Sequence, residues 1–138
     1  MNLLITGGLG HIGTYLLARS HELKKIKNIY VLDKMEEKFL TLVNLKLKRK
    51  INFINIDLSE EIIKFKDKKK FDIVIHLAST TNAEASVKDK KKVFKNNSGC
   101  FKNVLNFCLK NKIKLIHLSS TSVYGSQDLF VDEDCKEL

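Results

Sequence analysis

Short apolar runs alternate with polar or amphipathic stretches along most of the chain. Five runs have the length of β-strands and are almost continuously hydrophobic: NLLIT, NIYVLD, INFINID, FDIVIHLA and IKLIHLSS. Such runs are typical of parallel strands that are covered on both faces. The stretches between the runs predict helices that begin near His11, Glu36, Ser59 and, for the longest, between Glu84 and Val93, with its end at about Lys110.

This regular alternation of strand and helix predicts an α/β fold. We expect a Rossmann-type doubly wound parallel sheet of about five strands in the order 3-2-1-4-5, with right-handed crossovers and helices on both faces. Ligands bind to such sheets beyond the carboxyl ends of the strands. The residues that follow each strand are therefore the first candidates for a functional site.

Four glycines crowd the stretch TGGLGHIG between the first strand and the first helix. Gly7 can adopt backbone angles that are closed to other residues, Gly10 clears a path for a ligand, and Gly13 lets the helix pack against the strand. The amides at the start of the helix, from His11 and Ile12 onward, carry the positive end of the helix dipole and favour a phosphate. A tight turn without a ligand is the alternative.

A carboxylate after the second strand favours a dinucleotide. Asp33 ends the run NIYVLD twenty residues after Gly13, and dinucleotide-binding folds place an acidic residue at about this distance, against the adenosine ribose. Asp33 should accept hydrogen bonds from the ribose hydroxyls and repel a 2′-phosphate, although the neighbouring Lys34 softens that repulsion. The sequence therefore predicts NAD as the cofactor, with NADP less favoured.

Length and composition predict a single globular domain over residues 1–138. The chain is 43% hydrophobic and 30% charged, and no apolar run approaches the length that spans a membrane. The first residues show neither a basic leader nor a cleavage site, so we expect a cytoplasmic protein. The three cysteines, Cys100, Cys108 and Cys135, lack the spacing of a metal site, so we expect reduced thiols and no metal.

A net charge of +9 raises the possibility of nucleic-acid binding. The lysines are spread over several helix ends and loops, and no aromatic platform is interleaved with them. We therefore expect neither nucleic acid nor a membrane as a partner.

Four motifs then occur in a specific order: TGGLGHIG, NID with Asp57, HLAS from His76 to Ser79, and SSTSVYG from Ser119 to Gly125. In this order the chain resembles the N-terminal part of an extended short-chain dehydrogenase/reductase, the NAD-dependent epimerase/dehydratase family that acts on nucleotide sugars. The resemblance runs from Met1 to about Gly125. It implies NAD as the cofactor and a nucleotide sugar as the substrate of the complete enzyme.

The resemblance also implies roles for residues beyond the glycine turn. Asp57 and Leu58 are similar to the family's adenine contact, although an Asp at this position also suits a helix cap before Ser59. Leu77, Ala78 and Ser79 end the fourth strand, and the small side chains let the cofactor lie across them. A strand end that simply turns into a loop is the alternative.

In the long helix, NNSGC resembles the family's Asn-Val-x-Gly-Thr pattern. Asn96 matches the functional asparagine, whereas Asn97 replaces the valine and Cys100 the threonine. The resemblance implies that Asn96 braces a loop or the nicotinamide ribose, and a purely structural amide is the open alternative. We interpret His76 and His117 as structural, like the imidazole of His11.

The resemblance places the chemistry after the fifth strand, where Ser120 hydrogen-bonds the sugar hydroxyl that is oxidised. The family also needs a tyrosine with a lysine four residues later, and Tyr124 has Asp128 at that place. The catalytic tyrosine would fall beyond Leu138, so we expect this chain to be inactive alone and truncated before the substrate domain. A naturally short NAD-binding sensor or scaffold, and a companion chain, are the alternatives. We also expect a homo-oligomer or association with the missing C-terminal region.

Overall fold

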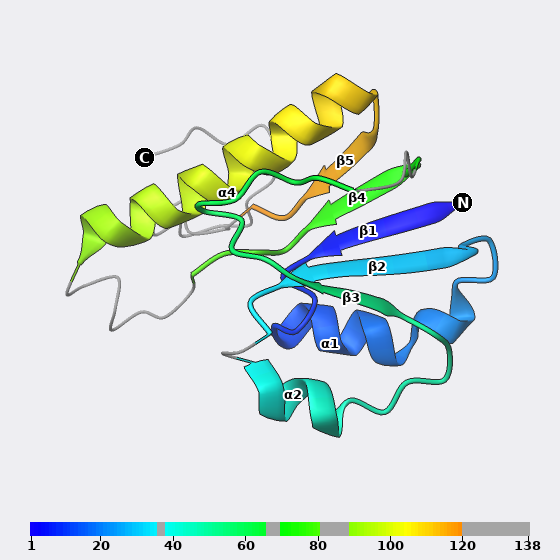
Figure 1. Ribbon diagram of the computed structural model, residues 1–138. Helices are drawn as coiled ribbons and strands as arrows, with labels where there is room; N and C mark the ends of the chain where they lie inside the picture. The colour runs from blue at the N-terminus through cyan, green and yellow to red at the C-terminus, as the bar shows by residue number, and fades with distance from the viewer. Residues whose placement is uncertain (36–37, 66–69, 81–88, 120–138) are drawn as a thin grey trace, which may run out of the picture.

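The computed structural model describes residues 1–35, 38–65, 70–80 and 89–119 (Figure 1). In chain order the elements are β1 (Asn2–Thr6), α1 (His11–Ala18), the 3-10 helix η1 (Ser20–Glu22), β2 (Asn28–Asp33), α2 (Phe39–Asn44), β3 (Asn52–Asn55), β4 (Ile73–His76), α4 (Lys90–Asn111) and β5 (Lys114–His117). All five expected strands form, and each lies within its predicted apolar run.

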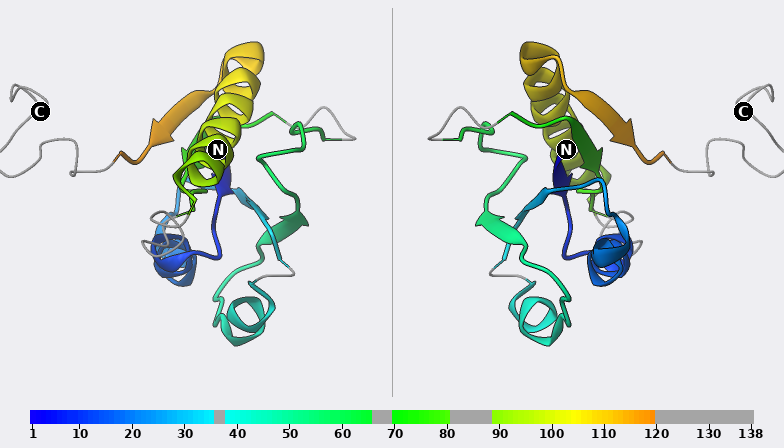
Figure 2. Two further views of the ribbon diagram at one scale, coloured as in Figure 1. Left: turned by 90° about the vertical axis from the view of Figure 1, so that its left-hand side faces the viewer. Right: turned by 90° about the vertical axis from the view of Figure 1, so that its right-hand side faces the viewer.

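The strands form one parallel sheet in the order β3-β2-β1-β4-β5. Helix α4 lies on one side of this sheet, and α1 and α2 lie on the other (Figure 1, Figure 2). The predicted Rossmann-type sheet, its strand order and its two helical layers are therefore confirmed.

Side chains of the central strand alternate between two cores, as the two-residue period of a strand requires. Leu4 packs into the core beneath α4, together with Val104 of that helix. Its neighbours Leu3 and Ile5 pack into the opposite core with Leu17 of α1. Because both of its faces are covered, β1 is hydrophobic along nearly its whole length.

The parallel register brings the carboxyl ends of several strands to one edge of the sheet. Thr6 at the end of β1 pairs with Leu32 on one side and with His76 on the other. Asp33 at the end of β2 pairs with Asn55 at the end of β3. The motifs that follow these strands are therefore neighbours in space.

The helix predicted near Ser59 is wrong within the described residues, because the chain forms a turn there. The carbonyl of Asp57 accepts hydrogen bonds from the amides of Glu60 and Glu61. Beyond the turn, Ile63 is buried in the core beneath α4.

Cys100 and Cys108 are free thiols on the buried face of α4. Burial raises the pKa of both thiols, so they pack in the core as small apolar groups. Cys135 lies outside the described residues. Over the described ranges, no cluster of His, Cys, Asp and Glu is suited to a metal ion, and no helix is long and apolar enough to cross a membrane.

Candidate functional site

A pocket of about 470 Å³ opens at the carboxyl edge of the sheet. Ten of the twelve cofactor-binding residues expected from the sequence line it: Gly7, Gly10, His11, Asp33, Asp57, Leu58, Leu77, Ala78, Ser79 and Asn96. They come from five separate segments of the chain. The structure therefore brings the glycine turn, the acidic strand ends and the small-residue strand end into one site.

The glycine turn leaves open space on its pocket side. Gly7 has a φ of +68°, and a Cβ added there would lie 2.6 Å from backbone atoms of Ala78. A Cβ added to Gly10 would meet only the carbonyl oxygen of Gly7, at 3.3 Å. Gly10 is also the N-cap of α1, so the unpaired amides of the first helical turn begin beside this open space.

Two expected residues, Ile12 and Gly13, do not line the pocket. The Ile12 side chain is 55% exposed on the outer surface of α1. Gly13 is buried, and an added Cβ would lie 2.5 Å from the backbone of Gly8, in keeping with its expected packing role. Gly8 was not predicted from the sequence to have a role of its own, but a Cβ there would lie 2.6 Å from Val31 Cγ1.

The Asp33 carboxylate is held by backbone amides on both oxygens. Leu9 of the glycine turn donates to Oδ2 over 2.7 Å, and Lys34 donates to Oδ1 over 2.8 Å. One carboxylate thus ties the end of β2 to the glycine turn. Its remaining lone pairs can still accept hydrogen bonds from a ligand in the pocket.

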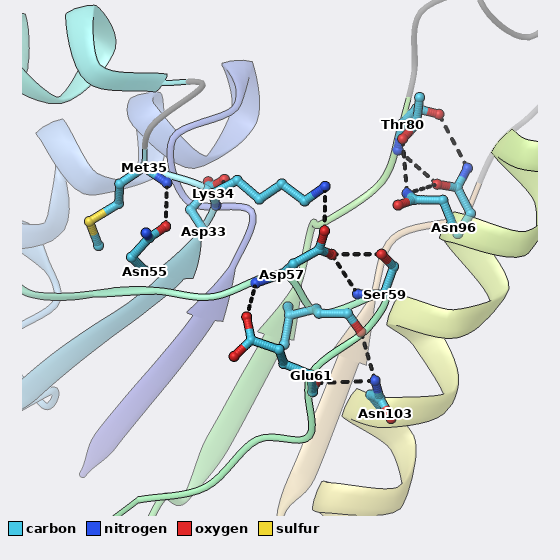
Figure 3. Close-up of polar contacts among 12 residues, drawn as sticks. Asp33, Lys34, Met35, Asn55, Asp57, Ser59, Glu61, Thr80, Asn96 and Asn103 are labelled. Carbon is cyan, nitrogen blue, oxygen red and sulfur yellow. Dashed lines mark hydrogen bonds and ion pairs between the residues drawn. The ribbon is translucent and has the colours of Figure 1, made fainter.

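Asp57 belongs to a polar network on the same wall of the pocket (Figure 3). Its Oδ2 pairs with Lys34 Nζ at 2.6 Å, and its Oδ1 accepts hydrogen bonds from the amide and the hydroxyl of Ser59. Burial alone would raise the pKa of Asp57, but the hydrogen bonds from Lys34 and Ser59 outweigh it and lower the pKa. Asp57 therefore caps a turn and not the helix considered from the sequence.

Two asparagines of α4 hold the segment after β4 (Figure 3). Asn96 Nδ2 donates to Thr80 Oγ1 over 2.9 Å. Asn97 accepts a hydrogen bond from the Thr80 amide over 2.7 Å and donates to its carbonyl over 3.2 Å. The loop-bracing role considered for Asn96 thus matches the geometry. Asn97 was not predicted as a site residue. The signal that could have indicated it is the polar asparagine at a position where the family usually has valine.

His76 is buried at the end of β4, where its Nδ1 shares a hydrogen bond of 2.6 Å with Thr6 Oγ1. Its ring stacks on His117 of β5 with 5.3 Å between centroids. Burial, with a smaller effect of His117, lowers the pKa of His76 from 6.5 to about 4. A neutral, buried imidazole suits the structural role expected for His76.

A tyrosine with a lysine four residues later does occur at Tyr30 and Lys34, a pair that was not considered from the sequence. Tyr30 lies in β2, and its ring contacts Phe71 edge to face with 5.3 Å between centroids. Lys34 instead pairs with Asp57. Tyr30 therefore packs in the core, and Lys34 forms an ion pair at the edge of the sheet. Ser120 and Tyr124 lie outside the described residues.

A second hollow, of about 950 Å³, lies beside α4 and is lined in part by Phe71, Asp72 and Asn111. Although it is larger, it contains none of the residues expected at the site. It adjoins the amino ends of β4 and β5, opposite the edge at which such sheets bind ligands. The smaller pocket is therefore the candidate site.

The strand order and the glycine turn at the carboxyl edge define a Rossmann-type protein. The chain belongs to the NAD dependent epimerase/dehydratase family, whose model matches residues 3–137. This finding confirms the resemblance noted from the four motifs.

Known relatives include two enzymes that are named for nucleotide sugars. A dTDP-D-glucose 4,6-dehydratase of Dictyostelium discoideum is 39% identical over 96% of this chain, and an ADP-L-glycero-D-manno-heptose-6-epimerase of Fusobacterium nucleatum is 30% identical over 96%. The chain spans 31% and 39% of the lengths of these two relatives.

Solved structures share the fold. The UDP-Glc/GlcNAc 4-epimerase of Campylobacter jejuni superposes with a TM-score of 0.80 at 27% identity, over 99% of this chain and 43% of that protein. A UDP-glucose-4-epimerase of Stenotrophomonas maltophila with bound NAD gives a TM-score of 0.81 at 20% identity, over 100% of this chain and 43% of that one. At 20% identity the second likeness supports the fold alone.

Proposed function

We propose that this chain binds NAD in the pocket at the carboxyl edge of the sheet, as the cofactor-binding part of an enzyme that modifies nucleotide sugars. One observation carries the proposal: residues expected to bind a dinucleotide converge from five segments on a single pocket. The open space beside Gly10 and the adjacent start of α1 suit a phosphate group. The donors and acceptors of the site therefore fit the cofactor that the family uses.

Each part of the pocket would hold a different part of NAD. The amides at the start of α1 would bind the pyrophosphate, and Asp33 would accept hydrogen bonds from the adenosine ribose. Asp57 and Leu58 would flank the adenine. Ala78 and Ser79 have small side chains, so the cofactor could lie across them. NAD, when bound, supplies a hydride acceptor; the residues named here bind and orient it.

The nucleotide-sugar assignment is supported by the family and by the two relatives named for such substrates. Ser120 remains the residue proposed to hydrogen-bond the sugar. Tyr30 and Lys34 are occupied in the sheet and at its edge, so they do not supply the expected proton-transfer pair. We therefore expect the 138-residue chain to bind NAD without turning over a sugar.

The test combines binding and turnover on the same protein. Isothermal titration calorimetry should detect NAD binding, and incubation with NAD and a panel of UDP-, GDP- and dTDP-sugars should leave the sugars unchanged on chromatography. An absence of NAD binding by the folded chain would overturn the proposed function. Turnover would instead contradict the expected inactivity. Tyr124→Phe would then test whether the tyrosine of the SSTSVYG motif acts as the base.

A further inference from the structure

Lys34 and Asp57 form an ion pair on the wall of the candidate pocket, next to the residue expected to face the adenosine ribose. Lys34 directly follows Asp33, and Asp57 comes from the segment after β3 (Figure 3). Lys34 Nζ lies 2.6 Å from Asp57 Oδ2, and the two side chains are 39% and 26% exposed. The cation nearest in sequence to Asp33 is thus already engaged by a carboxylate.

Asp57 is held in place by contacts that do not involve the pocket. Ser59 donates to Oδ1 from both its amide and its hydroxyl, over 2.9 and 2.6 Å. Asn103 of α4 donates to the carbonyl of Leu58 over 2.7 Å and ties the same turn to the long helix. The position of the Asp57 carboxylate is therefore fixed by the fold.

Four charged side chains line the pocket, Asp33 and Asp57 against Lys34 and Lys38. The two signs balance, so the pocket has no excess of positive charge for an added phosphate. A 2′-phosphate beside Asp33 would meet a fixed carboxylate, because two backbone amides hold Asp33. Of the two lysines that line the pocket, Lys34 directly follows Asp33 in the sequence, and its charge is offset by Asp57.

We infer that Asp57 determines the preference of this pocket for NAD over NADP by engaging Lys34, which would otherwise bind the 2′-phosphate. Asp57 is thus a specificity residue that acts through Lys34, in addition to any contact with adenine. The inference rests on the proposed dinucleotide site and adds to it a second layer of discrimination beyond Asp33.

The test measures the ratio of the dissociation constants for NADP and NAD in matched variants. Asp57→Asn keeps an oxygen acceptor for Ser59 but removes the charge that engages Lys34. Glu61→Gln is the matched control: it also removes one negative charge beside Asp57, because Glu61 Oε1 accepts from the Asp57 amide over 3.0 Å, but Glu61 does not line the pocket. Asp57→Ser provides a second variant if the asparagine disturbs folding.

Asp57→Asn should lower the ratio about tenfold, because the carboxylate that offsets the charge of Lys34 is removed, whereas Glu61→Gln should leave the ratio within about twofold. Adding Lys34→Met to Asp57→Asn should abolish the gain. Adenosine 2′,5′-bisphosphate compared with 5′-AMP should give the same pattern, which would place the effect at the adenosine end.

An unchanged ratio in Asp57→Asn or Asp57→Ser, with NAD still bound, would overturn the inference and leave the proposed function intact. A gain that survives Lys34→Met would also overturn it, because another group would then bind the phosphate. Failure of the unsubstituted protein to bind either dinucleotide would instead contradict the proposed function itself.

Discussion

The backbone amide of Leu9 donates a hydrogen bond of 2.7 Å to Asp33 Oδ2, which joins the glycine turn to the end of the second strand. Asp33 thus binds the backbone of the glycine turn and also lines the pocket. Asp33→Ala should remove both and weaken NAD binding about tenfold, in line with the loss of hydrogen bonds to a charged group. Calorimetry with NAD measures the effect.

The same carboxylate also underlies the expected preference for NAD. The unsubstituted protein should bind NAD more tightly than NADP, and Asp33→Ala should narrow the gap because the repulsion of the 2′-phosphate is lost. Calorimetry of both cofactors checks this expectation. Equal or tighter NADP binding by the unsubstituted protein would show that Asp33 does not act as proposed.

The two hydrogen bonds between the Asn97 side chain and the Thr80 backbone, here called the Asn97–Thr80 clamp, should stabilise the fold. Asn97→Val, which introduces the family's usual residue, should remove two hydrogen bonds to the Thr80 backbone and lower the free energy of unfolding by about 1–3 kcal/mol. Asn106→Val is a matched control, because Asn106 is exposed on the same helix. Urea denaturation should separate the two variants, and equal losses would count against the clamp.

His76 predicts how stability depends on pH. Its folded pKa of about 4 lies below the unfolded value of 6.5, so the unfolded chain binds the proton more readily between these values. The contribution of neutral His76 is complete above pH 6.5 and is lost as the pH falls toward 4, by up to about 3 kcal/mol.

Urea denaturation at several pH values should be compared between the unsubstituted protein and His76→Gln. The comparison separates the contribution of His76 to the unfolding free energy from that of carboxylates that titrate in the same pH range. The difference in unfolding free energy should shrink as the pH falls from 6.5 to 4. His21→Gln, at an exposed position, should follow the unsubstituted protein. A difference that stays constant with pH would contradict the buried neutral state of His76.

The strands were predictable because burial on both faces of the central strands demands continuous apolar runs. The strand order is that of the dinucleotide-binding fold, which the glycine turn and Asp33 indicated. Most of the pocket was predictable because strand ends meet at one edge. The turn at Ser59 was mispredicted as a helix because the hydrogen bonds from Ser59 to the Asp57 side chain suit both a helix start and an isolated turn, and a sequence pattern does not decide between the two.

The remaining contacts join residues that are far apart along the chain. Lys34 follows β2 and pairs with Asp57, which lies after the neighbouring strand β3. Asn97 of the long helix binds Thr80, which lies after β4. Gly8 is needed because Val31 of the neighbouring strand lies against it. Periodicity and motif spacing describe one segment at a time, so these pairings became visible only in the folded structure.

The central claim is that the glycine turn and the start of α1 form the dinucleotide site, and NAD binding by Gly10→Val tests it most directly. A Cβ at Gly10 would lie 3.3 Å from the carbonyl oxygen of Gly7, a contact that a small shift relieves, and no other protein atom outside the adjacent residues lies within 4 Å of it, so the fold should survive. Ala18→Val, at the far end of α1 and outside the pocket lining, is the control. The account predicts that both variants fold, by circular dichroism, and that only Gly10→Val loses detectable NAD binding by calorimetry. Unchanged NAD affinity in a folded Gly10→Val protein would contradict it and show that the turn is structural only.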